Sequence, residues 1–249
     1  MSNPQQYVDG SRSPDVQRIL VVTAHPDDLD FGAAGTIATW TKSGIEVAYC
    51  IATRGDSGQS GTLPRDEVAA SREAEQRAAA AAVGVSDVTF LGYPDSRVLV
   101  TLDLRRDIAR QIRRVRPQRV LTMTPERTWD RVVHNHPDHM AVGEATLCAV
   151  YPDAANPYIH PELFADEGLE AWRANDVWMI AAPQPTTYVD VTDTFDMKVA
   201  ALRAHASQTS HMSGLTDRLR AELAENAATV GLPEGRLAEV FRAFHTARA

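Results

Sequence analysis

Residues 16–52 carry the pattern from which the fold class follows, and they are VQRILVVTAHPDDLDFGAAGTIATWTKSGIEVAYCIA. Residues 16–23 form an apolar run rich in β-branched side chains, which predicts a buried strand, and residues 45–52 predict a second one. Between them, residues 32–42 have the small side chains of a helix, and Gly44 suits the left-handed conformation after a last helical turn. A strand, a helix and a strand in this order predict a parallel pair.

The same alternation continues along the chain and predicts an α/β fold with a mostly parallel sheet. Further strands are expected at residues 88–91, 119–123, 177–180 and 187–191. Further helices are expected at residues 65–83, 102–115, 137–150, 195–205, 215–227 and 236–247. Residues 151–174 lose this periodicity, so we expect them to cover one edge of the domain. Ligands of parallel sheets bind outside the carboxyl ends of the strands, so the site is expected there.

The composition is that of an ordinary globular protein and narrows the classes of function. The chain has 249 residues, 44% of them hydrophobic, which is enough for one core, so residues 16–249 are expected to form a single domain. The 25 basic and 33 acidic residues give a net charge of −8, which argues against a nucleic-acid partner. No apolar run approaches the roughly 18 residues that a membrane-spanning helix needs.

Two features bear on location. Residues 1–15 are polar and lack the apolar stretch of a secretory signal, so we expect a flexible lead-in. Cys50 and Cys148 lie far apart in apolar surroundings, which predicts packed thiols rather than a disulfide or a metal site. Together these features predict a protein of the reducing cytoplasm.

Histidine and aspartate gather just after two of the predicted strands. The first strand runs directly into residues 24–28, AHPDD, and the strand at 119–123 is followed by a loop and then by residues 134–139, HNHPDH. Ionisable groups at the end of a buried strand are costly unless something binds there. Both clusters lie at the same edge of the predicted sheet, so one shared site is expected.

This combination of side chains suits a divalent metal. Imidazole nitrogen and carboxylate oxygen are ligands of zinc, and catalytic zinc sites commonly use three protein ligands with one position open. His25, Asp28 and His139 supply such a set. His25 and Asp28 converge if the chain turns after the strand, whereas Asp27 projects in another direction and is left to act as a base.

Each residue taken alone also has an ordinary structural explanation. Asp27 or Asp28 is suited to cap the first helix, because aspartate is favoured there. His136 or Asp138 is equally suited to cap the helix that follows. His134 has no partner at a known spacing, and such a residue is more often a loop histidine than a ligand. Caps do not account for two histidine-containing clusters at two strand ends, so the joint pattern favours a metal site.

Three stretches resemble motifs of the PIG-L/LmbE-like family of metal-dependent deacetylases. Residues 24–35, AHPDDLDFGAAG, resemble A-H-P-D-D-x(5)-G-G, with Ala34 in place of the first of the paired glycines. Residues 136–139, HPDH, resemble H-x-D-H, and residues 198–208, KVAALRAHASQ, look like K-x-x-A-L-x-x-H-x-S-Q. The likeness runs from Ile19 to about Gln208 and implies a Rossmann-like, three-layer domain that binds zinc and removes acetyl groups from amino sugars.

The resemblance also implies a role for each matching residue. The metal ligands that the resemblance implies are His25, Asp28 and His139. Asp27 becomes the general base, and His136 faces the oxyanion and the leaving amine, with Asp138 orienting His136. The expected cofactor is Zn²⁺, with Fe²⁺, Mn²⁺ or Co²⁺ as alternatives. The metal acidifies a water molecule, Asp27 takes its proton, and a protonated His136 stabilises the oxyanion, which yields acetate and an amine from a small N-acetylated glycoconjugate.

Other residues enter with less specific patterns. Arg72 and Asp95 fall where the family contacts sugar hydroxyls, although Arg72 is equally explained as a solvated charge on a helix. His205, in the third motif, and His134 are candidates to support the site from behind the ligands. The loop residues 54–64 and 151–173 are expected to form the walls of the substrate pocket.

Three other functions remain open, of which the resemblance implies the first and the residues alone allow the other two. A metal-dependent hydratase of an unsaturated carboxylate would use the same water and the arginines near the predicted site. A non-haem iron oxygenase would use two histidines and one carboxylate, although the strand pattern and the additional Asp27 suit it less well. A metal-stabilised binding module is the third, although structural zinc sites are usually closed and rich in cysteine.

Residues 213–249 lie beyond the resemblance and are expected to form a C-terminal helical extension. Leucines at 215, 219 and 223, and later Leu237, Val240, Phe241 and Phe244, repeat on faces typical of amphipathic helices. Such faces pack on the domain or on a partner subunit, so a homo-oligomer is an open expectation.

Overall fold

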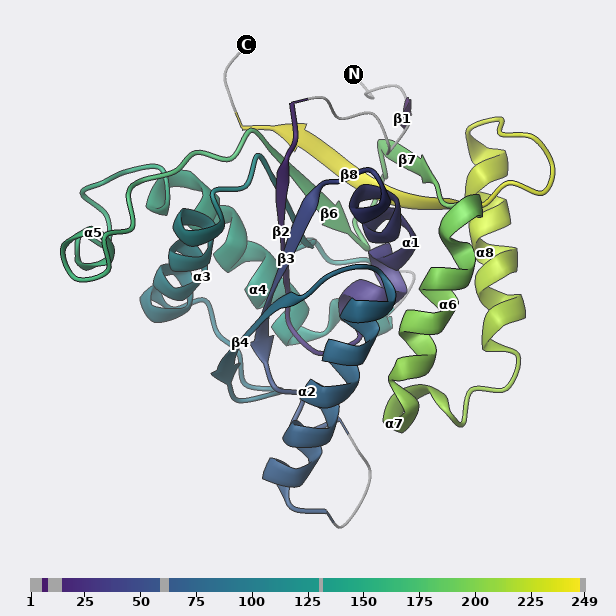
Figure 1. Cartoon of the computed structure of the whole chain (residues 1–249), viewed down its shortest axis with the longest axis horizontal. Coiled ribbons are helices and arrows are strands. Elements are labelled where there is room, and N and C mark those ends of the chain that lie inside the picture. The colour runs from purple at the N-terminus through teal and green to yellow at the C-terminus, as the bar shows by residue number, and fades with distance from the viewer. Residues whose placement is uncertain (1–5, 9–14, 59–62, 130–131, 247–249) are drawn as a thin grey trace.

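The structure, a computed structural model, describes residues 6–8, 15–58, 63–129 and 132–246 and confirms the predicted α/β class. Figure 1 shows one sheet through the middle of the protein with helices on both of its faces. The strand order is β1-β7-β8-β6-β5-β2-β3-β4. Neighbouring strands are parallel except for β8, which is antiparallel to both β6 and β7.

The bounds of the elements follow the predicted alternation closely. The strands are β1 Gln6–Val8, β2 Arg18–Thr23, β3 Glu46–Thr53, β4 Asp87–Tyr93, β5 Arg119–Met123, β6 Asp176–Ile180, β7 Thr187–Asp190 and β8 Ala238–His245. The α-helices are α1 Asp28–Lys42, α2 Arg65–Ala82, α3 Leu102–Val115, α4 Pro137–Cys148, α5 Glu162–Ala165, α6 Phe195–Ala204, α7 Ala206–Thr209 and α8 Leu215–Thr229. Shorter or irregular turns are η1 Val132–Asn135, η2 Ala149–Asp153 and η3 Thr192–Thr194.

The core forms where the two helical layers meet the sheet. Helices α3 and α4 pack against β2. Helix α1 also packs on the sheet, and α6 contacts both α1 and α2 (Figure 1). Every residue of β2 after Arg18 is buried, and so is every residue of β5. These apolar runs are continuous rather than alternating because both faces of the sheet are covered.

Helix α1 begins at Asp28, before the predicted start at residue 32. The carbonyl of Asp27 accepts the N–H groups of Asp30 and Phe31 at 2.9 and 3.1 Å, so the first helical turn forms immediately after residues 24–27. The predicted turn after the strand is therefore the start of a helix. Asp28 lies in that first turn, directly beside the end of β2.

The predicted helix at residues 236–247 is wrong, because residues 238–245 form strand β8. Its apolar residues Leu237, Val240, Phe241 and Phe244 have a spacing that also suits a helix, but the backbone pairs with β6 on one side and β7 on the other. The strand is thus an inner member of the sheet. Long-range pairing overrides a local spacing that does not distinguish the two structures.

Most of the C-terminal apolar residues pack within the chain. Helix α8 is confirmed, and its Leu219 and Leu223 are buried where the helix packs on β7 and β8. Leu237 and Phe241 belong to the same hydrophobic core as the rest of the sheet. The residues at 219, 223, 237 and 241 therefore pack on the domain, the first of the two predicted alternatives, whereas Phe244 is 40% exposed.

Residues 151–173 do not form a wall of the site. The guanidinium of Arg113, in the last turn of α3, donates to the carbonyls of Asp153, Asn156 and Ile159, and the Trp172 indole donates to the carbonyl of Pro117 just before β5. These partners lie at the amino-terminal edge of the sheet. The segment therefore covers an edge, as predicted, but the edge opposite the carboxyl ends of the strands.

Three smaller predictions concern the ends and the cysteines. Within the predicted lead-in, residues 6–8 form β1 and pair with β7, while residues 1–5 and 9–14 lie outside the described part. Cys50 is buried and Cys148 is half-buried, and both are free thiols. Among the described residues, no helix combines the length and apolarity that crossing a membrane requires.

Candidate metal centre and catalytic groups

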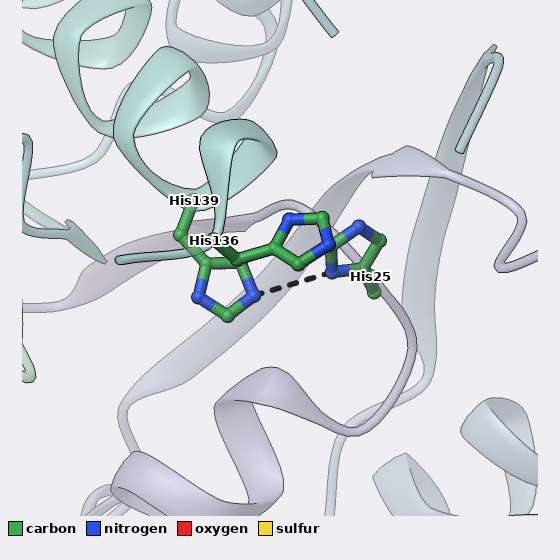
Figure 2. Close-up of side chains that lie close together, drawn as sticks. All are labelled: His25, His136 and His139. Atoms are coloured by element: carbon green, nitrogen blue, oxygen red, sulfur yellow. Dashed lines mark hydrogen bonds between the residues drawn. The ribbon is translucent and has the colours of Figure 1, made fainter. Parts of the chain in front are cut away.

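The two predicted clusters meet at the carboxyl ends of β2 and β5. Residues 24–28 leave the end of β2, and residues 136–139 form the start of α4 beyond β5. Figure 2 shows the rings of His25, His136 and His139 side by side. Their centroids lie 4.8 Å apart for His25 and His136, 5.2 Å for His25 and His139, and 5.1 Å for His136 and His139.

Three side chains form a triangle of the size that a metal requires, and Asp28 contributes a different carboxylate oxygen to each of its two sides. His25 Nδ1 lies 3.3 Å from His139 Nε2 and 3.4 Å from Asp28 Oδ2. His139 Nε2 lies 3.1 Å from Asp28 Oδ1. Metal–ligand bonds of about 2.0–2.1 Å in a tetrahedron place neighbouring ligand atoms about 3.3 Å apart. The spacing of His25, Asp28 and His139 therefore suits a zinc-like ion.

The other nitrogen of His25 faces carboxylates instead. His25 Nε2 lies 3.0 Å from Asp138 Oδ2 and 3.3 Å from Asp95 Oδ1. The Asp138 carboxylate also accepts the backbone N–H groups of Ser96 and Val98, at 2.7 and 3.1 Å. A carboxylate behind a ligating histidine fixes its tautomer and aims its second nitrogen at the metal.

Asp138 therefore does not hold the partner that was predicted for it. Its side chain is fully buried and bonds the ring of His25, whereas the resemblance had it orient His136. The backbone explains the difference, since Asp138 lies in the first turn of α4 and the loop at Ser96 and Val98 holds its carboxylate on the His25 side.

The charges around His25 create a place for a cation. Burial alone would lower the pKa of His25, but the carboxylates of Asp28, Asp138 and Asp95 together outweigh burial and raise the pKa to about 12. Burial would raise the pKa of Asp28, but His25 and His139 lower it overall. Carboxylates packed around one buried imidazole stabilise positive charge, which is what a divalent metal would supply.

Asp27 lies at a strained turn beside this triangle. Its φ of 86° is left-handed, and it occupies the N-cap position of α1 without making a side-chain capping bond. Its backbone N–H donates to Gln76 Oε1 at 2.8 Å. Burial raises the pKa of Asp27 to about 7, with the neighbouring Asp28 carboxylate as the second cause. Strained backbone and a carboxyl that titrates near neutrality are features of catalytic positions.

Arg72 holds Asp27 from α2 and is not a solvated surface charge. It is 4% exposed, and its Nη2 donates to Asp27 Oδ2 at 3.1 Å and to the carbonyl of Pro26 at 2.8 Å. The glycine-rich loop lies against it, because a Cβ at Gly58 would stand 2.1 Å from Arg72 Nη1 and one at Gly55 would stand 2.6 Å away. These glycines allow the loop to close over the guanidinium.

His136 both caps α4 and faces the site. Its Nδ1 accepts the backbone N–H of Asp138 at 3.2 Å, which confirms the capping alternative for this residue. Burial lowers the pKa of His136, and the charges of His25 and His139 lower it further. A neutral ring whose Nδ1 accepts a hydrogen bond carries its proton on Nε2, so His136 presents an N–H donor.

The remaining predicted residues have distinct positions. Asp95 is buried and accepts the N–H of Ser57 at 3.1 Å, and His25 holds its pKa near 2 despite burial. His205 is fully buried, with Nε2 2.8 Å from Asp30 Oδ2. His134 lies in η1, and its side chain is outside the described part of the chain.

Sequence reasoning did not single out Gln76 and Asp30. Gln76 Nε2 donates to Asp30 Oδ2 at 2.9 Å, and both side chains are fully buried. Gln76 follows Arg72 by one helical turn, so both lie on the face of α2 that turns toward the site. Helical spacing from Arg72 was the signal that could have identified Gln76.

An α/β protein with a His/Asp metal site and an adjacent carboxyl group at the carboxyl ends of its strands belongs to the class suited to metal-assisted hydrolysis. Residues 20–150 match the family described as PIG-L, GlcNAc-PI de-N-acetylase, and the chain belongs to this family. Members of the family are generally metal-dependent.

Curated relatives of the chain are deacetylases, that is, amide hydrolases. The diacetylchitobiose deacetylase of Thermococcus kodakarensis is 32% identical over 195 residues, which cover 78% of this chain and 71% of the relative. The 1D-myo-inositol 2-acetamido-2-deoxy-α-D-glucopyranoside deacetylase of Kineococcus radiotolerans is 32% identical over 83% of this chain and 73% of the relative.

Solved structures agree with the fold. The N,N'-diacetylchitobiose deacetylase of Pyrococcus horikoshii superposes with a TM-score of 0.84 at 27% identity, over 93% of this chain and 85% of that one. The 4-carboxy-2-hydroxymuconate hydratase of Pseudomonas putida KT2440 has a TM-score of 0.77 at 23% identity, over 94% and 98% of the two chains. The second likeness shows a shared fold.

Proposed function

We propose that this chain is a metal-dependent N-deacetylase that hydrolyses the acetamido group of an N-acetylated amino-sugar conjugate. The observation that carries the proposal is the triangle of donor atoms from His25, Asp28 and His139, with the carboxyl group of Asp27 next to it on the same turn. Deacetylase relatives at 32% identity support the reaction class.

The proposed metal is Zn²⁺, with Fe²⁺, Mn²⁺ or Co²⁺ as alternatives that the same ligands accept. His25, Asp28 and His139 would hold it. When bound, the ion supplies a Lewis acid for the acyl oxygen and makes a water molecule more acidic. Asp138 keeps the Nε2 of His25 engaged, which leaves Nδ1 directed at the ion.

Asp27 is the proposed general base. A base works best when its pKa is near the working pH, and burial brings the pKa of Asp27 to about 7. The carboxylate takes a proton from the attacking water while a bond forms between the water oxygen and the acetyl carbon. The same proton then passes to the sugar nitrogen as the carbon–nitrogen bond breaks, so acetate and a free amine leave.

His136 is the proposed oxyanion donor. Its Nε2–H would donate to the acyl oxygen as negative charge develops there, which stabilises the transition state more than the substrate. The predicted protonated imidazole is replaced by a neutral one, because burial and the two neighbouring histidines lower the pKa of His136. Asp138 acts in this scheme through His25.

The proposed substrate contacts are Arg72 and Asp95. They are linked through the loop after β3, since Arg72 Nη1 donates to the Gly55 carbonyl at 3.3 Å and the Ser57 N–H donates to Asp95. Arg72 would donate hydrogen bonds to sugar hydroxyls, and the Asp95 carboxylate would accept them. The relatives act on N-acetylglucosamine derivatives with different attached groups, so the proposed class is an N-acetylglucosamine conjugate. A cytoplasmic location accords with the two free thiols.

A hydratase is the second candidate, because a hydratase has the same fold. It would add water to a double bond of an unsaturated carboxylate without releasing acetate. Acetate release therefore separates the two reactions in one assay.

The test is metal analysis followed by acetate release from a panel of N-acetylglucosamine conjugates, for the wild type and for Asp27→Asn. The expected result is about one metal ion per chain in both proteins and a loss of turnover of about 10²- to 10⁴-fold in the variant. An Asp27→Asn protein that keeps its metal and its turnover would contradict the base assignment, and a wild type without metal would overturn the proposal.

A further inference from the structure

A chain of buried side chains leads from the turn at Asp27 to the far side of α1. The Asp27 N–H donates to Gln76 Oε1 at 2.8 Å, Gln76 Nε2 donates to Asp30 Oδ2 at 2.9 Å, and His205 Nε2 lies 2.8 Å from the same oxygen. Gln76, Asp30 and His205 are each 0% exposed. They come from α2, α1 and the junction of α6 with α7.

Each hydrogen bond in this chain fixes the direction of the next. The Asp27 N–H is a donor only, so the atom of Gln76 facing it must be the amide oxygen. The amide nitrogen of Gln76 then points at Asp30, whose carboxylate must accept. Because Asp30 Oδ2 accepts from Gln76, His205 Nε2 is best placed to donate to that oxygen as well. The imidazole at residue 205 thereby holds the carboxylate of Asp30, to which the amide of Gln76 donates.

The arrangement is not needed to fill the core. Asp30 Oδ1 and His205 Nδ1 are buried and have no hydrogen-bond partner among the described residues. Buried polar groups with unmet hydrogen bonds cost stability, and apolar residues of similar shape would pack there without that cost. Such groups are kept where they hold something in place that packing alone does not.

Gln76 holds in place a strained turn of the backbone at Asp27. Asp27 has a left-handed φ of 86°, and residues of this kind persist only when their surroundings over-determine them. Arg72 holds the side chain through Oδ2 and the preceding carbonyl of Pro26, but these contacts leave the amide of Asp27 to Gln76. The two sets of contacts together define where the carboxyl group of Asp27 points.

We propose that Gln76, Asp30 and His205 are positioning residues, which hold the backbone of Asp27 so that its carboxyl group faces the reacting water. The proposal rests on the proposed function and deepens it. It assigns a purpose to His205, which lies far from Asp27 in the sequence and makes its contact through Asp30.

The test compares Gln76→Met, which keeps the size and removes both hydrogen bonds, with Gln111→Met on α3. Gln111 is also buried, and its Oε1 accepts a hydrogen bond from Arg114 on the same helix. Helix α3 lies on the other face of the sheet, away from Asp27. Gln76→Met should lower kcat about 10- to 100-fold with KM and metal content unchanged, as expected when a reacting group is displaced. Gln111→Met should leave kcat unchanged.

Two further measurements separate positioning from general weakening. In an Asp27→Asn background, Gln76→Met should cause no additional loss of turnover, because both changes act through the same group. His205→Gln keeps an N–H donor and should retain more kcat than His205→Leu. The proposal would be overturned if Gln76→Met lowered kcat equally in the wild type and in Asp27→Asn. Equal losses for His205→Gln and His205→Leu would overturn it as well.

Amide hydrogen exchange gives a readout that does not depend on turnover. The Asp27 amide should exchange about tenfold faster in Gln76→Met than in the wild type, since it loses its acceptor. Unchanged exchange would overturn the positioning role even if turnover fell. If the wild type releases no acetate from any conjugate, the proposed function fails while the exchange experiment still decides whether Gln76 holds the turn.

Discussion

Removing one partner of the buried ion pair between Lys198 and Glu239 should destabilise the fold strongly. Lys198 Nζ lies 2.7 Å from Glu239 Oε1, and the two side chains are 1% and 2% exposed. The same ammonium donates to the carbonyls of Asp30 and Phe31, at 3.0 and 2.6 Å. The pair therefore ties α6 and β8 to the first turn of α1, which begins at Asp28.

Glu239 completes this tie from the strand. Its carboxylate accepts the backbone N–H groups of Gly35 and Thr36, at 3.0 and 2.7 Å. Gly35 permits the close approach, since a Cβ there would stand 2.8 Å from Val191 and 3.2 Å from Glu239 Oε1. In a Lys198→Met variant, the buried carboxylate would keep these two donors and lose its only cation among the ion pairs described for Glu239.

The expected loss in the free energy of unfolding of Lys198→Met is limited by the two N–H donors that Glu239 keeps. Removing one partner of a buried ion pair costs about 3–5 kcal/mol, and the two remaining N–H donors place the loss at about 3–4 kcal/mol. In a chain of 249 residues, 1 kcal/mol corresponds to about 2–4 °C in Tm. The Tm of Lys198→Met should therefore fall by about 6–16 °C.

Denaturant unfolding followed by circular dichroism measures the free energy, and calorimetry measures Tm. The control is Arg242→Gln on the same strand, which breaks an ion pair with Glu126 whose side chains are 36% and 45% exposed, and which should cost less than about 1 kcal/mol. Adding Glu239→Gln to Lys198→Met should recover part of the loss. A loss below about 1 kcal/mol for Lys198→Met, or strict additivity in the double variant, would refute the reasoning.

Three other outcomes are expected. Chelation should abolish acetate release and lower Tm, because a ligand bound only by the folded state stabilises it, and added Zn²⁺ should restore both; turnover that survives removal of the metal would contradict the proposed site. Gly58→Ala should lower kcat about tenfold, since its Cβ would stand 2.1 Å from Arg72 Nη1 and displace the guanidinium from Asp27; unchanged kinetics would show that the loop yields instead. Deleting residues 236–249 should abolish the cooperative thermal transition seen by circular dichroism, because β8 is an inner strand, whereas a dispensable extension would leave the transition in place.

The alternation of strands and helices was readable from the sequence because it depends on local pattern. The helix at residues 102–115 and the strand at 119–123 have the predicted bounds. The positions of the two His/Asp clusters also followed, since the carboxyl ends of parallel strands lie at one edge. The start of α1 directly after β2 places His25 beside Asp28, and the pairing of β2 with β5 brings the start of α4 with His139 to the same edge.

The partners of individual side chains depended on the packing of distant segments. Asp138 bonds His25 rather than His136 because the loop at Ser96 and Val98, after β4, holds its carboxylate. Arg72 became a buried support of Asp27 because the loop after β3 closes over α2. Spacing along the chain contains no information on such contacts.

The C-terminal segment shows the limit most clearly. The spacing of Leu237, Val240, Phe241 and Phe244 is compatible with a helix, and it became a strand because β6 and β7 offer unpaired backbone edges on both sides. Local periodicity therefore specified the βαβ framework and the residues at its strand ends. Backbone pairing and burial between segments far apart in the chain specified β8, its Glu239 and the polar groups that hold the turn at Asp27, because hydrogen bonds between distant segments exist only after the chain has folded.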